Sequence, residues 1–445
     1  MIIELPEHVT YILHTLAVHG YEGYAVGGCV RDALLGRQPQ DWDITTNAAP
    51  AQVKALFRRC VDTGLQHGTV TVMLDHTGYE VTTYRIDGVY EDGRHPKEVS
   101  FTASLAEDLK RRDFTINAMA YNETDGLVDL FDGAGDLKRG VIRCVGVPEQ
   151  RFTEDALRMM RAVRFSAQLG FAIERSTLAA VCALAPSIQK ISAERIQMEL
   201  LKTITSAHPM DVRLFYETGL SRYFLPELDA MMETEQNNPH HCYSVGEHAL
   251  HSLALVEPEK VLRLAMLLHD VAKPACQTRD EEGVDHFHGH PQLGAQMARH
   301  ILRRLKLDND TIARVCALVC WHDDNPPLTA RNVRRAICRI GESQYPDIFL
   351  VKRADIGAQS DYKKTEKFRY VDEYEAIYRD IIAKKDCLDV KSLAVNGADL
   401  LAAGVPQGRQ IGEYLHRLLE LVIEEPSCNT KEFLIGQVEI WRGPA

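Results

Sequence analysis

A change in hydrophobic periodicity near Phe152 constrains the fold of this chain more than any other feature of its sequence. Before that point, GTVTVML and YEVTTYR alternate apolar and polar residues or are rich in β-branched residues, which is typical of strands. After it, EDALRMMRAVRFSAQLG and SAERIQMELLKTI carry apolar residues at helical spacing. The sequence therefore predicts an α+β protein, with a mixed sheet and helices first and an all-α remainder.

The bulk composition excludes several classes of protein. A chain of 445 residues is too long for one ordinary core, so several domains are expected. No apolar run reaches the roughly 18 residues of a membrane span, and the N-terminus lacks a signal peptide, so we expect a cytoplasmic protein without membrane contact. The eleven cysteines are scattered without CxxC pairs, which predicts buried reduced thiols rather than disulfides or a zinc cluster.

The charge is acidic overall but locally basic. The net charge of −12 argues against a uniformly basic surface for nucleic-acid binding. Residues 137–215, however, contain 12 Lys and Arg against 7 Asp and Glu. This segment is compatible with a polyanionic partner without requiring one.

The segment AVGGCVRDALLGRQPQDWDITT combines a glycine turn, a cation and paired carboxylates. Glycines let backbone N–H groups approach a ligand, and the start of a following helix favours anions. Strand alternation would place Asp41 and Asp43 on one face, where they can share a divalent cation. The alternative to a metal-binding pair is that both aspartates are solvated or lie in an ordinary turn. Together these features indicate metal-assisted nucleotidyl transfer, with Glu80 as a candidate third carboxylate or else a surface acid.

Five segments, in this order, resemble the class II tRNA nucleotidyltransferase (CCA-adding enzyme) and bacterial poly(A) polymerase family: GGCVRDALLGRQPQDWDITTNA, HGTVTV, RRDFTINAMAYN, EDALRMMRAVRFSAQLGF and SAERI. The resemblance covers the first 215 residues and implies a polymerase-β-like nucleotidyltransferase head in which Asp41 and Asp43 hold Mg²⁺. It also implies that one group of residues binds the nucleotide: Gly27, Gly28, Arg31, Asp32, Arg111, Arg112, Asp113 and Asn117.

The EDALR segment points to base selection. Asp155 and Arg158 are three residues apart, so a helix would place them on one face and offer an acceptor and a donor to a base edge. In the resembled family this pair hydrogen-bonds cytosine and adenine in turn. Arg161 and Arg164 follow on the same segment and join the predicted nucleotide-binding set. The alternative is an exposed helix carrying ion pairs.

The expected product depends on a second resemblance. The segment IDGVYEDGRHPKEVSF, with Asp92, Arg94 and Pro96, resembles the flexible loop of enzymes that switch from C to A addition. This favours full CCA addition over CC-only addition, whereas A-only or poly(A) addition stays open. The expected partners are tRNA, CTP and ATP.

Histidines in the second half indicate another site. The order His248, His269–Asp270, Asp355, with Lys273 nearby, resembles the HD metal-dependent phosphohydrolase superfamily. His290 and His322 fall where two-metal members place further ligands. Imidazole and carboxylate suit a divalent cation, whose identity the sequence leaves open. The alternative is a set of satisfied core histidines in a domain that only supports tRNA. Four other histidines are expected to be surface or loop residues: His240, His241, His286 and His288.

These observations predict four domains: a head at 1–145, a helical neck with nucleotide-selecting and RNA-binding motifs at 146–220, an HD domain at 221–385 and a helical tail at 386–445. The predicted function is template-independent transfer of CMP and AMP from CTP and ATP to the tRNA 3′ end, with Mg²⁺, together with an HD phosphohydrolase activity. The alternatives are a poly(A) polymerase or A-adding enzyme, and an RNA-end phosphohydrolase acting on 2′,3′-cyclic phosphates or phosphomonoesters. The oligomeric state is not predicted.

Overall fold

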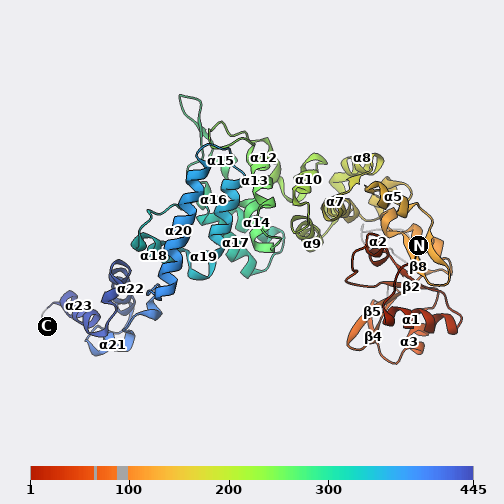
Figure 1. Cartoon of the computed structure of the whole chain (residues 1–445), viewed down its shortest axis with the longest axis horizontal. Helices are drawn as coiled ribbons and strands as arrows, with labels where there is room; N and C mark the ends of the chain where they lie inside the picture. The colour runs from red at the N-terminus through yellow and green to blue at the C-terminus, as the bar shows by residue number, and fades with distance from the viewer. Residues whose placement is uncertain (1, 65–67, 88–98, 444–445) are drawn as a thin grey trace. The chain divides into compact units, whose positions relative to one another are not determined.

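The computed structural model describes residues 2–64, 68–87 and 99–443. The chain divides into two compact units, residues 1–229 and 230–445, whose helices and strands are labelled in Figure 1. The loop residues Asp92, Arg94 and Pro96, on which the prediction of full CCA addition depends, lie outside the described residues. The division into four domains is finer than these two units and stays a prediction.

The N-terminal unit is built on a seven-stranded sheet with the order β3-β4-β5-β2-β1-β8-β9. Figure 1 labels β2, β4, β5 and β8 of this sheet. Strands β2 and β5 are parallel and the other neighbours are antiparallel, which confirms the predicted mixed sheet. The strands are β1 (Gly23–Val26), β2 (Ile44–Thr46), β3 (Cys60–Gly64), β4 (Thr69–Leu74), β5 (Thr77–Thr83), β8 (Met119–Asn122) and β9 (Gly126–Asp129).

Two helices, α1 (Glu7–Val18) and α3 (Pro50–Leu56), supply the core on one side of this sheet. Along β4 the side chains alternate, so that Val70 and Val72 are fully buried while their neighbours reach the surface. Val70 and Val72 belong to the same core cluster as Leu16 of α1, and burying each such side chain stabilises the fold by about 1.5–3 kcal/mol.

The turn after β1 has the predicted geometry. Gly27 has a φ of +84°, in the left-handed region that favours glycine, and α2 (Gly28–Leu34) begins directly after it. The nearby elements are α4 (Leu105–Lys110), a 3-10 helix (Thr115–Asn117), α5 (Gly133–Arg139) and the paired strands β6 (Arg85–Asp87) and β7 (Val99–Phe101).

Helices dominate the rest of the N-terminal unit. Strand β11 (Ala172–Ile173), which pairs in parallel with β10 (Val141–Ile142), is a short exception to the all-α expectation. The helices are α6 (Pro148–Glu154), α7 (Leu157–Leu169), α8 (Arg175–Leu184), α9 (Ala193–Ile204), α10 (Arg213–Glu217), α11 (Ser221–Phe224) and α12 (Pro226–Glu233), with 3-10 turns at Ala185–Lys190 and Pro209–Val212.

The second unit is helical apart from a short hairpin, β12 (Thr278–Arg279) with β13 (Asp285–His286). Its helices are α13 (Val245–Ala254), α14 (Lys260–Leu268), α15 (Lys273–Cys276), α16 (His290–Arg304), α17 (Asn309–Trp321), α18 (Ala330–Ile340), α19 (Tyr345–Gly357), α20 (Lys364–Lys384), α21 (Gly397–Ala402), α22 (Arg409–Glu424) and α23 (Lys431–Arg442), with 3-10 turns at Glu342–Gln344, Val390–Ser392 and Pro426–Cys428. The last three helices form a core of their own around Leu418, Val422 and Leu434.

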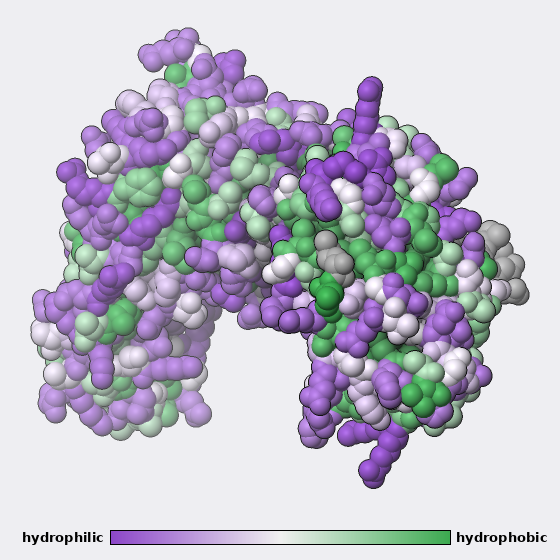
Figure 2. Space-filling view, turned by 45° about the vertical axis from the view of Figure 1, so that its right-hand side comes forward, coloured by the Kyte–Doolittle hydropathy of each residue, from purple (hydrophilic) through white to green (hydrophobic). Residues whose placement is uncertain are grey.

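The surface is mixed, and hydrophobic residues appear between hydrophilic ones in Figure 2. Within the described part of the chain, no helix combines the length and apolar character needed to cross a membrane. All eleven cysteines are free thiols. The expectation that they are buried is wrong for Cys182 and Cys242, which are exposed.

Candidate functional site

Three carboxylates gather at one end of the central strands of the head. Asp41 and Asp43 come just before β2 rather than within it, and both are exposed. Ile44 pairs with Val81 across the parallel strands β2 and β5, so Asp43 and Glu80, one residue earlier on each, are neighbours on the same face. The register therefore places the predicted third carboxylate beside the predicted pair.

The charges of these carboxylates are not balanced. Desolvation raises the pKa of Asp43, with Arg112 opposing the rise and Asp41 adding to it. Desolvation, followed by the charges of Asp43 and Asp41, raises the pKa of Glu80. Accumulated negative charge with exposed oxygens is what a divalent cation with oxygen ligands requires, so these residues fit the predicted metal.

The glycine turn and the second predicted motif meet at Arg31. Its guanidinium donates to both oxygens of Asp32 (2.9 and 3.0 Å) and to Oδ1 of Asn117 (2.8 Å). A Cβ at Gly27 would lie 3.1 Å from Nη1 of Arg112, so a side chain there would crowd a predicted nucleotide-binding arginine. Residues from two distant segments therefore form one polar surface around the turn.

Asp113 links this surface to the helical segment. Its carboxylate accepts from Nδ2 of Asn117 (3.2 Å) and from Arg161 (2.7 Å). Although Asp113 is buried, the guanidinium groups of Arg161 and Arg158 hold the pKa of its carboxyl well below the usual range. The ionised carboxylate thus fixes Asn117 and Arg161 in place.

Two residues that the sequence analysis missed organise the predicted arginines. Asp108, which is fully buried, accepts from Arg111 (2.8 Å) and Arg112 (3.3 Å). The three- and four-residue spacing of this group was a readable helical signal. Phe165 lies under three guanidinium groups at centroid distances of 5.2, 5.3 and 4.3 Å, those of Arg31, Arg161 and Arg164.

Arg164 lies deeper than a direct ligand of the nucleotide would. It is 6 % exposed and pairs with Glu199 at 3.2 Å. Burial, together with the charge of Arg161, lowers its pKa to about 10. Its guanidinium lies over the ring of Phe165, which suits a role in supporting the neighbouring arginines.

The expectation that Asp155 and Arg158 share one helical face is wrong. α6 ends at Glu154 and α7 begins at Leu157, and Asp155 between them has an extended backbone (φ −141°, ψ 105°). The helix breaks here because the Asp155 carboxylate accepts from the backbone N–H of Leu157 (3.0 Å) at the start of α7. Arg195, another residue that the sequence analysis did not single out, donates to the same carboxylate at 2.7 Å.

Arg158 is held separately from Asp155. It donates to Glu154 (2.8 Å) and to the backbone carbonyl of Arg111 (3.0 Å). The residue is 9 % exposed, so the alternative of a fully solvated ion-pair helix does not describe it. The two residues stand at a joint between helices, each fixed by its own partner.

The second unit contains a compact histidine cluster. The ligand atoms of His248, His269 and Asp270 lie within 4.8 Å of one another, as do those of Asp270, His290 and His322. Nε2 of His248 is 2.8 Å from Oδ1 of Asp355, which brings the last predicted residue to the cluster. Asp270 belongs to both groups, with Oδ2 facing His269 (3.2 Å) and Oδ1 facing His290 (3.4 Å).

Each imidazole is oriented by a backbone carbonyl. Nδ1 of His269 lies 2.8 Å from the carbonyl oxygen of Met266, and Nδ1 of His290 lies 2.7 Å from that of Phe287. Nδ1 of His322 lies 2.7 Å from the carbonyl oxygen of Val319, and Nδ1 of His248 lies 3.4 Å from that of Ala358. When Nδ1 donates to a carbonyl, the Nε2 of a neutral imidazole carries a lone pair and no hydrogen. All four Nε2 atoms therefore face the cluster as potential metal ligands.

This arrangement suits a cation at the centre. Nε2 of His269 and Nε2 of His248 are only 3.2 Å apart, so two lone pairs would face each other without a proton or a metal between them. Despite burial, Asp270 and Asp355 raise the pKa of His269 to about 10. Burial lowers the pKa of His322 to about 3, which leaves it the neutral imidazole that a metal binds. The residues present thus fit a divalent metal better than a satisfied core.

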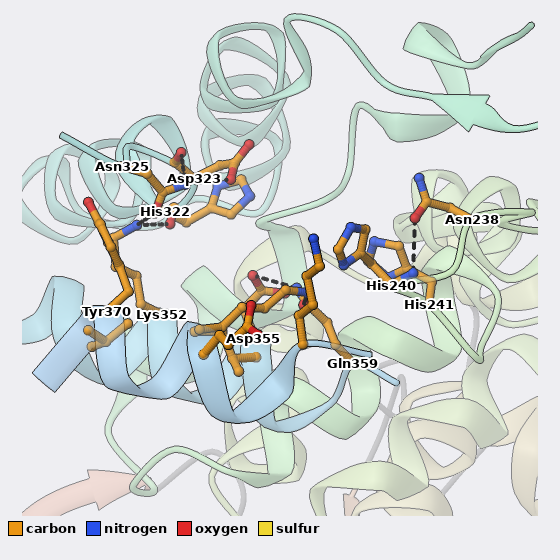
Figure 3. A pocket seen from close by; sticks show the side chains of 15 residues that line it. Asn238, His240, His241, His322, Asp323, Asn325, Lys352, Asp355, Gln359 and Tyr370 are labelled. Carbon is orange, nitrogen blue, oxygen red and sulfur yellow. Dashed lines mark hydrogen bonds between the residues drawn. The ribbon is translucent and has the colours of Figure 1, made fainter. Parts of the chain in front are cut away.

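Two cavities, of about 480 and 310 Å³, open beside the cluster and share His322, Asp323 and Asp355 in their walls. Figure 3 shows the larger one, with His322 and Asp355 on either side of it. None of the four further histidines expected to be surface or loop residues is buried, and all four line these cavities: His240, His241, His286 and His288.

Comparison with known proteins supports both sites. Residues 23–143 match the family model of the poly A polymerase head domain, residues 170–232 match the probable RNA and SrmB-binding site of polymerase A, and residues 240–358 match the HD domain. Of two curated CCA-adding enzymes, that of Levilactobacillus brevis is 51% identical over 433 residues and that of Lactiplantibacillus plantarum is 36% identical over 431 residues. These alignments cover 96% and 95% of this chain and 96% and 93% of the relatives.

Solved structures agree with this similarity. The crystal structure of the Bacillus stearothermophilus CCA-adding enzyme in complex with CTP is 32% identical, with a TM-score of 0.75, and the match covers 97% of this chain and 96% of that one. The Thermotoga maritima CCA-adding enzyme complexed with tRNA is 19% identical, with a TM-score of 0.61, over 98% of this chain and 95% of that one. The second likeness supports the fold alone.

Proposed function

The chain belongs to the CCA-adding enzyme family, and from this premise we propose how its residues add CMP and AMP from CTP and ATP to the 3′ hydroxyl of tRNA. The reaction uses no nucleic-acid template and releases pyrophosphate at each addition. Full CCA addition is preferred to A-only or poly(A) addition, because the curated relatives reported above are named CCA-adding enzymes. We place the reaction in the cytoplasm, where tRNA and nucleoside triphosphates occur.

The observation that carries this function is the junction of two motifs beside the carboxylates. Arg31, from the glycine turn, is bonded to Asn117, from the second motif, while the strand register brings Glu80 beside Asp43. We assign triphosphate binding to the turn at Gly27 and Gly28 and to the arginines around it, since backbone N–H groups and guanidinium groups both suit phosphate.

Asp41, Asp43 and Glu80 are the residues that would hold divalent cations here, and we propose Mg²⁺ because all three offer hard oxygen ligands. When bound, such ions neutralise the triphosphate and lower the pKa of the attacking hydroxyl. The remaining task of the protein is positioning. Asp113 fixes Asn117 and Arg161, and Asp108 fixes Arg111 and Arg112, so the cationic groups are already placed when the nucleotide arrives.

We propose that Asp155 and Arg158 select the base from the joint between α6 and α7. Each has a charged partner, Arg195 for Asp155 (2.7 Å) and Glu154 for Arg158 (2.8 Å). Such partners fix where the acceptor and the donor stand, which is what discrimination between cytosine and adenine edges requires. Arg195 and Glu154 are therefore positioning residues for selection.

The test is extension of three tRNA transcripts that end before CCA, after the first C and after CC. With labelled CTP or ATP and Mg²⁺, we expect C on the first two transcripts and A on the third. Asp41→Ala should extend none of them. Repeated A addition regardless of the RNA end would replace this function with poly(A) synthesis, and full activity of Asp41→Ala would refute the proposed metal site.

The histidine cluster favours a second function. We propose that it is a two-metal phosphohydrolase, with Asp270 shared between a site at His248, His269 and Asp355 and a site at His290 and His322. Metals held in this way would supply an activated water. The substrates that fit this chemistry are 2′,3′-cyclic phosphates or phosphomonoesters at RNA ends, so the activity would complement repair of the tRNA 3′ end.

Metal content tests this second function independently of activity. Elemental analysis of the purified protein is expected to find bound transition metal in the wild type and less in His269→Ala, with parallel loss of hydrolysis of a 2′,3′-cyclic nucleotide. His300→Ala, on the exposed side of α16, is the matched control. Equal metal content and hydrolysis in all three proteins would contradict the assignment.

We further propose that the predicted domains divide these tasks. Catalysis lies in the head at 1–145, nucleotide selection and RNA contact in the neck at 146–220, hydrolysis in the HD domain at 221–385, and further RNA support in the tail at 386–445. Deletion of residues 386–445 should then weaken binding of tRNA while leaving metal content at the cluster unchanged.

A further inference from the structure

The cavity of about 480 Å³ beside the histidine cluster has a wall that the cluster chemistry does not use. It is lined by residues of α19 and of the first turns of α20, and it touches the cluster at His322 and Asp355 (Figure 3). The second cavity, of about 310 Å³, shares His322 and Asp355 with it and also reaches the cluster at Asp270 and His290. A ligand whose phosphate lies at the cluster can therefore extend its other half into the larger cavity.

Positive charge lines this wall. Lys352 is 3 % exposed, and its ammonium donates to the carbonyl oxygen of His322 (2.9 Å) and to Oδ1 of Asn325 (3.1 Å). Lys363 and Lys367 stand four residues apart at the start of α20. Lys367 donates to Oε1 of Gln359, whose amide nitrogen is 3.1 Å from both oxygens of Asp355.

These lysines lack close counter-ions. Among the described residues, no carboxylate lies within 4.0 Å of the ammonium groups of Lys352, Lys363 or Lys367, whereas the adjacent Lys364 has Asp361 at 3.6 Å. Asp323 and Glu366 also line the cavity, but they stand outside this distance. The wall therefore offers cations that an additional anionic group of the ligand can engage.

The rest of the wall suits a nucleoside. Ile356, Tyr370 and Val371 contribute apolar surface. His240 and His241 also line the cavity, and their buried Nδ1 atoms have no hydrogen-bond partner among the described residues. A cavity of this size that combines apolar surface with a few polar groups is typical of small-molecule sites.

From these contacts we infer that the cavity binds a nucleoside carrying two phosphate groups. One phosphate lies at the cluster, the nucleoside lies against Tyr370 and Val371, and the second phosphate is held by Lys363 and Lys367. The inference rests on the proposed hydrolase function: water adds to the phosphorus at the cluster, the bond from phosphorus to the nucleoside oxygen breaks, and a proton passes to that oxygen. A free nucleoside bisphosphate and a 3′-phosphorylated RNA end share this chemistry.

Hydrolysis by the metal-loaded, full-length protein tests the inference. The substrates are adenosine 3′-monophosphate, adenosine 3′,5′-bisphosphate and a short RNA with a 3′ phosphate. The double variant Lys363→Ala/Lys367→Ala should lower kcat/KM about 10-fold more for the two substrates that carry a second phosphate than for the monophosphate. Lys364→Ala is the control, because its ammonium is already occupied by the carbonyl of Gly357 (3.1 Å) and by Asp361.

The outcomes separate the proposed second-phosphate subsite from the proposed hydrolase function, and they identify the source of the ligand. Higher kcat/KM for the RNA than for the free bisphosphate would identify an RNA end as the source, and the reverse would identify a free nucleotide. An equal loss on all three substrates would overturn the inference. Equilibrium dialysis of adenosine 3′,5′-bisphosphate against protein in EDTA adds a readout without hydrolysis. Weaker binding by the double variant would support the subsite even if no substrate were cleaved, and equal binding would refute it.

Discussion

The head and the histidine cluster hold their acidic groups under opposite conditions. Asp43 and Glu80 of the head are exposed, and desolvation together with neighbouring carboxylates raises the pKa of each. Asp270 and Asp355 lie in a buried cluster, where, despite burial, histidine and lysine neighbours hold their pKa values well below the usual range. One site gathers negative charge that Arg112 only partly offsets, and the other has its compensation built in.

This difference indicates how each site relates to its ligands. In the head, charge balance has to come from cations and a nucleotide that enter and leave during each addition. In the cluster, His269 and Lys273 already balance the negative charge of Asp270, and Nζ of Lys273 lies 2.8 Å from its carboxylate. A metal that binds here would therefore displace a proton. We therefore expect substitutions in the head to change catalysis and substitutions in the cluster to change folding as well.

The largest effect is expected for Asp43→Ala. Loss of a cation ligand should reduce nucleotide incorporation about a thousandfold or more, because charge neutralisation is removed from the reacting triphosphate. The exposed position predicts an unchanged thermal transition. Single-nucleotide extension and a melting curve measure the two quantities. Asp62→Ala, at another exposed aspartate of the head, is the control. Equal activity of the two variants would show that Asp43 has no special role in catalysis.

Asp270→Asn should act on stability. Removal of one partner of a buried charged cluster costs about 3 kcal/mol of unfolding free energy. Urea unfolding of the protein in EDTA measures this loss, and elemental analysis should find that bound metal is also reduced. Asp361→Asn, at a side chain fully open to water, should change neither quantity. An unchanged urea midpoint in Asp270→Asn would show that the cluster does not contribute to stability as proposed.

A smaller, selective effect is expected for Arg195→Ala. Without its partner, Asp155 loses its fixed orientation, so the preference for CTP over ATP on a transcript lacking CCA should fall about 10-fold. The total rate with saturating CTP should change less than this ratio. Lys202→Ala, on an exposed face of the same helix, is the control. Identical selectivity in both variants would show that Arg195 has only a structural role.

The smallest effect, of opposite sign, is expected for Asp43→Asn in EDTA. A carboxyl whose folded-state pKa is raised destabilises the fold when ionised, so removing its charge should raise the Tm at pH 7, by about 1 °C at most because the side chain is exposed. The difference should vanish as the pH falls through the raised pKa.

For Asp270 the folded-state pKa is lowered, so the contribution of its carboxylate to stability is present at neutral pH and is lost on acidification. Melting curves at pH 7 and pH 4 compare the two variants, and a lower Tm for Asp43→Asn would contradict the sign.

Local sequence patterns predicted most of the head. The strand, glycine turn and helix around Gly27 were readable because each depends on a few adjacent residues, and the order of motifs led to the carboxylates. The break at Asp155 was not readable, since the apolar spacing continues across it and only the capping bond to Leu157 shows where α7 begins. Arg195 was missed because its partner Asp155 is 40 residues away, and the contact of Phe165 with the distant Arg31 was equally invisible.

In the second unit, the order of histidines and aspartates predicted the members of the cluster. It did not predict the carbonyl that orients each ring, because those bonds depend on where helices end. The lysines of α20 carry no motif at all. The relation of Lys367 to Asp355 through Gln359 exists only because α19 and α20 pack together.

The orientation of three of the imidazoles has a wider consequence. In His269, His290 and His322, Nδ1 bonds the carbonyl three residues earlier, and two of these carbonyls belong to the last turn of a helix, where backbone acceptors lack partners. One hydrogen bond thus satisfies a carbonyl at the helix end and orients the imidazole ring, without any additional side chain. A histidine placed just beyond the end of a stable helix is therefore a transferable unit, which protein engineers can graft onto unrelated helical bundles to present aligned nitrogen ligands.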